Sequence, residues 1–259
     1  MSTESYHRRS QGRSLEEFAE NRDEPQVSRY VESKATVDRV AALVMLALSW
    51  PLILVLIALV RLTSRGPALY KQVRLGLDGR PYLILKLRTM YHDCERATGP
   101  QWARARDPRA TPLGRILRAT HLDELPQLWN VVRGEMSLVG PRPERPEFVR
   151  QLERVIPNYR ERLQVRPGIT GLAQVQLPPD EDIDSVARKV AYDVYYVERI
   201  HPWLDLRILL GTALKVAGSS YGCIRLLVAL PRPEIVLGKV PQEAMNADLT
   251  LREFVTTAG

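Results

Sequence analysis

The chain has 259 residues, a formal net charge of +7 at pH 7 and two cysteines. This length gives room for one sizeable domain or two small ones. The excess of basic side chains favours anionic partners, which are nucleic acid, an acidic lipid surface or a phosphorylated substrate. Two cysteines make no disulfide framework, and no Cys/His pairs occur at zinc spacing. Composition therefore argues against a disulfide-stapled fold and a structural zinc site, and leaves the three kinds of anionic partner open.

Residues 1–34 are dense in Arg, Glu, Asp, Ser and Gln and contain few apolar side chains. Such a segment cannot bury enough apolar surface to offset the entropy lost on ordering, so we expect a disordered polar tail. No short basic leader with a small-residue cleavage site precedes the first apolar run. We therefore expect no cleaved signal peptide and a protein that stays on the cytoplasmic side.

The stretch from Val40 to Val60 carries no charge. As a straight helix it would span about 31 Å, which is roughly the thickness of the bilayer hydrocarbon. Pro51 lies near its middle, where proline costs a helix about 3 kcal/mol, so a kinked span and a helix-break-helix hairpin are both open. Basic residues flank both ends, namely Lys34, Arg39, Arg61, Arg65 and Lys71. Because positive flanks stay in the cytoplasm, we favour residues 35–64 as a re-entrant hairpin, with a single full span as the alternative.

Two strand-like runs follow, Ala68–Leu75 and Tyr82–Leu87, separated by a segment that contains Asp78-Gly79. Asp-Gly favours a tight hairpin because both residues accept positive φ. Side chains two apart in a strand share a face, so Lys86 and Arg88 are expected together at the far end of the hairpin. They are interpreted either as solvated edge charges or as phosphate contacts.

Residues 91–112 are typical of a loop, and Leu113–Ala119 of a short helix. Asp123 and Glu124 come next, just before Pro126. Proline is tolerated only in the first turn of a helix, so the two acids are predicted to open a helix that ends at Gly134. Free N–H groups and the positive end of the helix dipole suit phosphate at that position. The alternative is that Asp123 is simply an N-cap and Glu124 an ordinary acid of the first turn.

Two arginines accompany the acidic pair. Arg118 lies one turn upstream, and Arg142 lies between Pro141 and Pro143. The prolines fix the backbone around Arg142, which lowers the entropy cost of holding its guanidinium as a phosphate fork. The alternatives are a solvated arginine and a plain structural turn.

The remainder of the chain favours helices. Amphipathic helices are predicted over Pro146–Val155 and Pro157–Val165, and further helices over Ser185–Arg199 and Trp203–Val216. The last of these suits a helix in the bilayer interface and a packed core helix equally well. The fold class expected is α+β and mostly helical: a re-entrant membrane hairpin at 35–64, then a cytosolic catalytic domain at 65–222 with a small β-hairpin and interfacial amphipathic helices. Residues 223–259 receive no functional assignment.

Six short strings occur in fixed order: Gln72–Gly76, Lys86–Met90, Asp107–Thr111, Leu122–Gln127, Met136–Pro143 and Pro167–Gly171. Together they closely resemble the bacterial sugar transferases, which are monotopic polyprenyl-phosphate phosphoglycosyl transferases. The resemblance covers residues 35 to 222. It implies transfer of a sugar 1-phosphate from a nucleotide diphosphate sugar, expected to be a UDP-sugar, to undecaprenyl or another polyprenyl phosphate. Mg²⁺ would assist, UMP would be released, and the enzyme would lie on the cytoplasmic face of the bacterial inner membrane.

The same resemblance implies residue roles. Asp123 would be the nucleophile that forms a covalent phospho-sugar intermediate, and Glu124 would hold Mg²⁺ or accept a proton, with either acid able to contact the metal. Phosphate contacts are implied for Arg118, Arg142, Lys86 and Arg88, and nucleotide contacts for Thr170 and Gln174. Trp50 stands between Ser49 and Pro51, a departure from the family that leaves the exact helix break open. The sugar, the polyprenol, the pathway of exopolysaccharide or surface glycan synthesis and a homo-oligomeric state also stay open.

One rival class fits the charge and the apolar segment as well. A membrane-anchored basic assembly factor would bind nucleic acid or anionic lipid without catalysis. It gives no reason for an adjacent acidic pair among arginines, because carboxylates repel a polyanion. We therefore expect an enzyme whose partners are a nucleotide sugar, a polyprenyl phosphate and the bilayer, and not nucleic acid.

Overall fold

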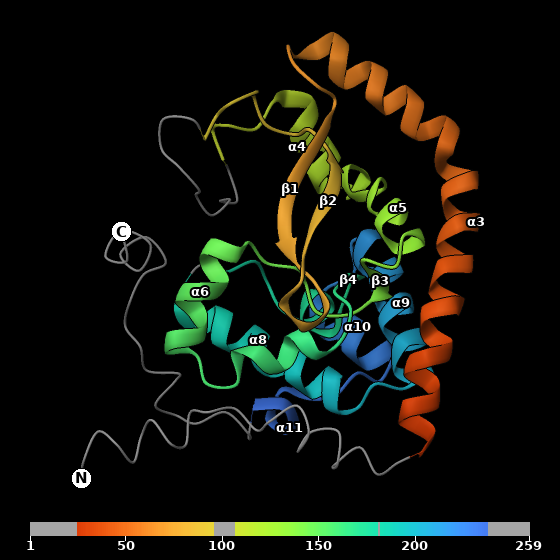
Figure 1. Cartoon of the computed structure of the whole chain (residues 1–259), viewed down its shortest axis with the longest axis vertical. Helices are drawn as coiled ribbons and strands as arrows, with labels where there is room; N and C mark the ends of the chain where they lie inside the picture. Colours follow the sequence, from red (N-terminus) through yellow and green to blue (C-terminus); the bar gives the residue numbers. More distant parts are fainter. Residues whose placement is uncertain (1–24, 96–106, 181, 238–259) are drawn as a thin grey trace.

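A computed structural model describes residues 25–95, 107–180 and 182–237 (Figure 1). The helices of these ranges are α3 (Pro25–Thr63), α4 (Pro112–Ala119), α5 (Gln127–Val132), α6 (Pro146–Val155), α7 (Leu172–Gln176), α8 (Ile183–Glu198), α9 (Pro202–Val216), α10 (Tyr221–Leu227) and α11 (Pro233–Leu237). The strands are β1 (Leu69–Leu75), β2 (Pro81–Leu87), β3 (Ser137–Val139) and β4 (Gly168–Thr170), with short 3₁₀ turns η1 (Leu77–Gly79), η2 (Leu122–Glu124) and η3 (Tyr159–Gln164). The described chain is therefore mostly helical with a small β-hairpin, as predicted, and it has a second small sheet, of β3 and β4, that the sequence analysis does not predict.

Helix α3 is one continuous helix of 39 residues with Pro51 inside it, so the complete break expected at this site is absent. In Figure 1 the helix runs along one side of the molecule and bends over its end towards β1. The Ser49 hydroxyl donates to the Met45 carbonyl at 2.7 Å, an i−4 bond of the kind that often accompanies helix bending. Pro51 therefore does not end this helix.

The helix also begins earlier than expected, since residues 25–34 are helical and not a disordered tail; residues 1–24 lie outside the described ranges. A buried polar network explains the difference. Lys34 forms ion pairs with Asp38 at 2.9 Å and with Asp205 of α9 at 2.6 Å, and the Tyr30 hydroxyl donates to Asp205 at 2.5 Å. The Ser137 hydroxyl of β3 donates to Asp38. Composition missed this order because the partners lie far away in the sequence.

Both ends of α3 are attached to the same folded domain. Near its start Tyr30 and Val31 pack against the main core, and near its end Leu56 and Val60 pack with Leu87 and Leu117. The helix is long and apolar enough to cross a membrane, with a mean hydropathy of 2.8 over a window of which only 17% is buried. The domain thus holds the two ends of α3 and leaves most of its apolar surface uncovered.

Strands β1 and β2 form the predicted hairpin, antiparallel from Leu69↔Leu87 to Leu75↔Pro81. The turn contains Asp78 at φ 55° and Gly79 at φ 73°, as the Asp-Gly pair indicates. On the other edge of β2, the Asn130 side chain of α5 accepts from the Leu85 N–H at 3.0 Å and donates to the Leu83 carbonyl at 2.7 Å. This amide continues the hydrogen bonding of the strand edge and fixes α5 beside β2.

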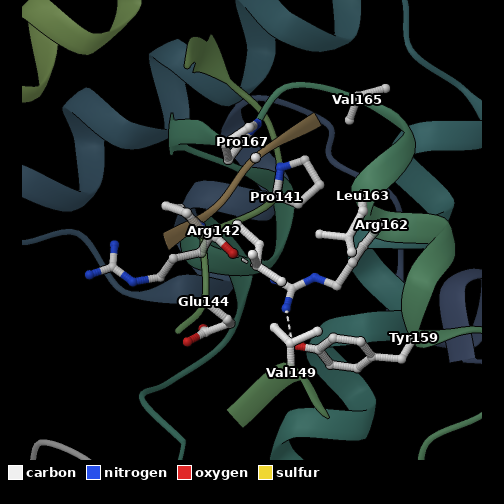
Figure 2. A pocket seen from close by; sticks show the side chains of 12 residues that line it. Pro141, Arg142, Glu144, Val149, Tyr159, Arg162, Leu163, Val165 and Pro167 are labelled. Atoms are coloured by element: carbon white, nitrogen blue, oxygen red, sulfur yellow. Dashed lines mark hydrogen bonds between the residues drawn. The ribbon is translucent and has the colours of Figure 1, made fainter. Parts of the chain in front are cut away.

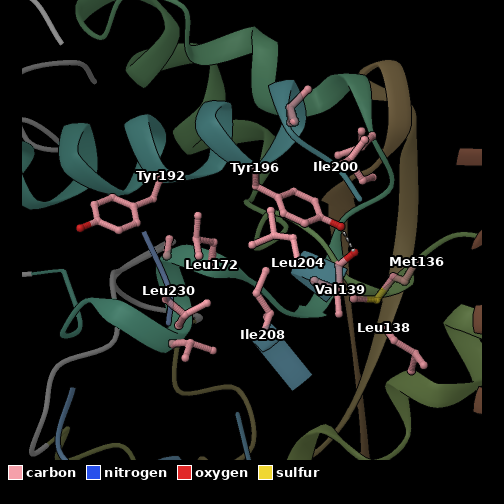
Figure 3. Close-up of a cluster of buried hydrophobic side chains, with 14 of the residues drawn as sticks. Met136, Leu138, Val139, Leu172, Tyr192, Tyr196, Ile200, Leu204, Ile208 and Leu230 are labelled. Atoms are coloured by element: carbon pink, nitrogen blue, oxygen red, sulfur yellow. Dashed lines mark hydrogen bonds between the residues drawn. The ribbon is translucent and has the colours of Figure 1, made fainter. Parts of the chain in front are cut away.

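Strands β3 and β4 are parallel, with Ser137 opposite Gly168 and Val139 opposite Thr170. The main core surrounds them (Figure 3), and the Tyr196 hydroxyl of α8 donates to the Val139 carbonyl at 3.1 Å. Ile224 of α10 is fully buried in the same core. The proposed domain end at residue 222 therefore cuts through a helix that belongs to the fold.

Helix α9 has features of both predicted alternatives, a packed core helix and a helix with an exposed apolar side. Leu204 and Ile208 are buried in the core, whereas Trp203, Leu206 and Leu210 are exposed. The helix is packed on one side and presents an apolar stripe on the other. In contrast, Pro157–Val165 is not an α-helix as expected but contains the 3₁₀ turn η3.

Helix α4 depends on a close approach that only glycine permits. A Cβ placed on Gly114 would lie 1.9 Å from the Thr89 carbonyl oxygen. We expect Gly114→Ala to destabilise the protein by about 1–3 kcal/mol, because backbone must shift to relieve the overlap. Gly222→Ala is the matched control, since its Cβ would meet open space within helix α10. Thermal unfolding in detergent should show a lower melting temperature for the first variant and not for the second; equal melting would contradict this packing.

Candidate active site

The acidic pair lies in the 3₁₀ turn η2, between α4 and α5. His121 precedes it in a left-handed conformation at φ 57°, which turns the chain sharply after α4. Helix α5 begins at Gln127, after Pro126, so the acids stand one turn before the helix they were predicted to open. Gly134 at φ 77° ends the segment as predicted.

Glu124 is the centre of an ion cluster. Its Oε1 accepts from Lys86 Nζ at 2.8 Å and from Arg142 Nη2 at 3.0 Å. Burial by itself raises the pKa of Glu124, but the charges and hydrogen bonds of Lys86 and Arg142 outweigh it and hold the pKa well below its usual range. Glu124 is therefore ionised, and it joins β2 to the segment that follows β3.

Asp123 has the opposite environment. Its side chain is buried, and no residue that the structure describes gives it a hydrogen bond or an ion pair. Burial raises its pKa, the neighbouring charge of Glu124 raises it further, and the charges of Lys86, Arg118 and Arg142 oppose this rise. Adjacent residues thus provide one carboxylate that is saturated with cations and one that is available.

Arg118 and Arg142 stand near the pair in different ways. Arg118 extends from α4, and its Nε donates to the Thr89 hydroxyl at 2.8 Å. Its charge is among those that act on Asp123. Arg142 contacts Glu124 directly, although its side chain remains 44% exposed. Both arginines keep donors that can face an incoming phosphate.

The backbone around Arg142 is held from two sides. Arg162 Nη2 donates to the Arg142 carbonyl at 2.8 Å, as Figure 2 shows, and Arg74 Nη1 donates to the Pro143 carbonyl at 3.1 Å. Arg162 is itself buried and paired with Asp193 at 2.6 Å. Burial raises the pKa of Asp193 to about 6, in spite of the opposing charge of Arg162. Sequence reasoning missed these supports, although Arg74 lies in one of the six strings.

Lys86 and Arg88 do not reach the same place. Lys86 contacts Glu124, whereas Arg88 donates to the Arg65 carbonyl at 2.6 Å and to the Ser64 carbonyl at 2.8 Å. Ser64 and Arg65 directly follow the last residue of α3. Arg88 therefore provides hydrogen-bond donors to backbone carbonyls just beyond the end of this helix. A phosphate contact for Arg88 stays a prediction, and its observed contacts are structural.

Thr170 and Gln174 lie beside the Arg142 segment. The Gly140 N–H donates to the Thr170 carbonyl at 2.9 Å. A Cβ on Gly168 would lie 2.1 Å from the Gly140 nitrogen, so glycine lets the two segments touch. The Thr170 hydroxyl pairs with that of Thr212 at 2.7 Å, and Gln174 Nε2 donates to a backbone carbonyl at 3.0 Å. Nucleotide contacts from these two side chains also stay a prediction.

The acidic pair fits a magnesium ion of the kind that acts on phosphates. Within the described ranges no three His, Cys, Asp or Glu side chains cluster as a metal site. Mg²⁺ commonly takes only one or two carboxylates, with water and substrate phosphate completing its shell. The carboxylate of Asp123 is available, and both ion pairs of Glu124 use Oε1.

A family comparison decides the class of protein. The model of the family described as bacterial sugar transferase matches residues 29–219. The chain belongs to this family. The family prediction from the six strings is confirmed, and with it the prediction that the chain is a transferase.

Three curated relatives illustrate the relationship. The chain is 47% identical over 183 residues to a UDP-glucose:undecaprenyl-phosphate glucose-1-phosphate transferase of Caulobacter vibrioides, covering 69% of this chain and 67% of that protein. It is 39% identical over 193 residues to a protein of the same name from Xanthomonas campestris pv. campestris, covering 74% and 40%. It is 41% identical over 183 residues to a UDP-N-acetylgalactosamine-undecaprenyl-phosphate N-acetylgalactosaminephosphotransferase of Aeromonas hydrophila, covering 71% and 43%. The transferase thus spans less than half the length of the last two relatives.

Neutralising the two acids should change stability in opposite directions. Folding raises the pKa of Asp123, so its charge destabilises the folded state at any pH above that raised pKa. Folding lowers the pKa of Glu124, so its charge stabilises the protein above its ordinary pKa of 4.5, and this contribution is lost as the pH falls towards the lowered value. At pH 7 we expect Asp123→Asn to raise the melting temperature by a few degrees and Glu124→Gln to lower it.

Differential scanning fluorimetry between pH 4 and pH 8 measures both effects. The gain from Asp123→Asn should be complete above the raised pKa of Asp123 and should fade as the pH falls through that pKa towards the ordinary value of 3.8. Shifts of the same sign for both variants at pH 7 would mean that the two carboxylates do not have the contrasting environments described.

Proposed function

We propose that this transferase moves a sugar 1-phosphate from a UDP-sugar to undecaprenyl phosphate through a covalent intermediate on Asp123. The observation that carries the proposal is the buried, unpaired Asp123 carboxylate beside a Glu124 that is already saturated with cations. The names of the three relatives support the substrate classes, and because they include both glucose and N-acetylgalactosamine they leave the sugar open.

In the first half-reaction an Asp123 oxygen attacks the phosphorus that carries the sugar. The bond from that phosphorus to the bridging oxygen breaks, and the electron pair leaves with UMP. In the second half-reaction an oxygen of undecaprenyl phosphate attacks the same phosphorus, the bond to Asp123 breaks, and the carboxylate is regenerated. Two displacements replace one transfer between two polyanions. The raised pKa of Asp123 marks a more basic carboxylate, which suits a nucleophile.

Glu124 suits a different role. A general base works best when its pKa is near the operating pH, and the pKa of Glu124 is held well below its usual range. Its environment therefore favours orientation of Lys86 and Arg142, or a share in a metal site, over proton acceptance. Lys86, Arg118 and Arg142 would neutralise the charge of the transferred phosphate. A Mg²⁺ held by Asp123 or Glu124 would add Lewis-acid stabilisation of the same charge.

For the membrane we propose that both ends of α3 lie on the cytoplasmic face and that the helix enters the bilayer without crossing it. One folded domain holds Lys34 near the start of the helix and Val60 and Ser64 near its end. A domain on one side of a bilayer cannot bind both ends of a helix that spans it. The bend of α3 in Figure 1 and the exposed apolar surface between the two attachments agree with this placement. The reacting groups would then meet a lipid phosphate at the membrane surface.

Membership of a transferase family favours this enzyme over the non-enzymatic assembly factor. The arrangement of the acidic pair agrees, since a carboxylate with no ion pair among the described residues would repel a polyanion. Nucleic-acid binding whose affinity falls steeply with salt concentration, without turnover of any nucleotide sugar, would instead support the non-enzymatic assembly factor.

The covalent route predicts an exchange reaction that needs no lipid. Labelled UMP should enter the UDP-sugar with enzyme and Mg²⁺ alone, because the first half-reaction is reversible and complete in itself. Asp123→Asn should lower the exchange rate by at least about a thousandfold, since an amide is a poor nucleophile. Arg80→Gln, an exposed change at the hairpin turn, is the matched control and should exchange normally. A preparation that turns over with lipid but shows no exchange without it would indicate direct transfer.

Cysteine labelling tests the placement of α3. In a Cys94→Ser, Cys223→Ser background, Glu32→Cys and Arg65→Cys place exposed thiols near the two ends of the helix. We expect both to be protected from an impermeant reagent in intact cells and both to react after lysis. Labelling of one position from outside would establish a full span.

A further inference from the structure

Lys215 lies on the last turn of α9 and contacts the segment that runs from β4 into α7. Its Nζ donates to the Gln174 carbonyl at 2.5 Å and lies 5.3 Å from the centre of the Tyr221 ring. One turn earlier, the Thr212 hydroxyl pairs with that of Thr170 at 2.7 Å. Thr212 and Lys215 of α9 therefore contact the segment from Thr170 to Gln174. We call this segment, together with the adjoining segment that carries Arg142, the active face.

The segment that Lys215 contacts is in backbone contact with the segment that carries Arg142. The Gly140 N–H donates to the Thr170 carbonyl at 2.9 Å, and a Cβ on Gly171 would lie 2.2 Å from the Gly140 carbonyl oxygen. Gln174 follows Gly171 by three residues, and Arg142 follows Gly140 by two. Lys215 thus contacts one of two adjoining segments, and the other carries Arg142, which contacts Glu124 of the acidic pair.

The charge of Lys215 is not neutralised within the protein. No carboxylate of the described residues lies within ion-pair distance of its Nζ, whereas the neighbouring Lys189 is paired with Asp180 at 2.8 Å. Burial lowers the pKa of Lys215, the charges of Lys189 and Arg142 lower it further, and Glu124 opposes them. An ammonium group has three donors, and one is used by the Gln174 carbonyl.

A half-buried ammonium without an ion-pair partner among the described residues carries an electrostatic cost. An oxyanion placed between Lys215 and Arg142 would remove that cost and accept the remaining donors. Phosphate is the oxyanion that this active face handles in the proposed function, on which the inference rests. A diphosphate is also longer than one phosphate, so it can extend from the acidic pair towards a second cation.

We infer that Lys215 is a phosphate-binding residue of the active site, which contacts a substrate phosphate on the side of Arg142 away from Asp123. The two sources of such a phosphate are the nucleotide and the polyprenyl phosphate. Separate half-reactions distinguish them, because exchange of UMP involves the nucleotide alone.

The test compares Lys215→Met, Lys215→Gln and Lys215→Arg with the control Lys71→Met, which removes an exposed lysine on β1. The first readout is the concentration of UMP that raises the melting temperature half-maximally, which requires no catalysis. The second is the KM for the UDP-sugar in the exchange reaction, and the third is the KM for undecaprenyl phosphate in full turnover.

Loss of one charge-assisted phosphate contact should weaken binding about tenfold. We expect the Met and Gln variants to bind UMP about tenfold more weakly or to show a KM for one substrate raised by that factor, with kcat changed less. Lys215→Arg should keep most of the affinity, and Lys71→Met should behave as wild type. A shift in UMP affinity and donor KM assigns the contact to the nucleotide, and a shift confined to the acceptor KM assigns it to the lipid phosphate.

Two results would overturn the inference. In a folded Lys215→Met or Lys215→Gln protein, unchanged UMP affinity and unchanged KM for both substrates would make the lysine a structural residue that ties α9 to Gln174. A fall in kcat with no change in affinity would lead to the same conclusion. Because UMP binding is measured without turnover, the result for Lys215 stands even if the covalent mechanism fails in the exchange experiment.

Discussion

The ion cluster around Glu124 is the constraint on which the site depends. One buried carboxylate accepts from Lys86 at 2.8 Å and from Arg142 at 3.0 Å, and the three residues come from β2, η2 and the segment after β3. Removing one partner from such a cluster leaves an uncompensated buried charge, so all three elements must be in place together. The same arrangement leaves Asp123 without a cation of its own, since Lys86 and Arg142 both face its neighbour. The surroundings thus distribute positive charge unequally between the two adjacent carboxylates.

The scaffold holds the members of this cluster by bonds that do not touch the reacting groups. Asn130 ties α5 to the edge of β2, and so keeps the segment of Glu124 beside Lys86. Arg162, which is paired with Asp193, donates to the Arg142 carbonyl and so holds the backbone at this residue. Lys34 pairs with Asp205 and so joins α3 to α9. Buried polar bonds of this kind specify one arrangement of the elements more sharply than apolar contacts do.

Local rules explain what could be predicted from the sequence. The Asp78-Gly79 turn, the start of α6 at Pro146 and the stop at Gly134 each follow from the φ that those residues allow, so they needed no knowledge of the rest of the fold. The adjacent acids, and Arg142 between two prolines, were identified in the same way. What escaped prediction depends on distant partners. The order of residues 25–34 depends on Asp205, the placement of Arg88 depends on the carbonyls at the end of α3, and Lys215 is of interest only because Gln174 and Arg142 are near it.

The central claim is that Asp123 becomes covalently bonded to the sugar phosphate. Intact-protein mass spectrometry after brief incubation with UDP-sugar and Mg²⁺, without lipid, tests it most directly, with peptide mapping to locate any adduct. The account predicts a mass increase equal to the sugar phosphate group on the peptide that contains Asp123, which disappears when undecaprenyl phosphate is added. An enzyme that is fully active with lipid but forms no adduct under these conditions, or forms it on another residue, would contradict the account.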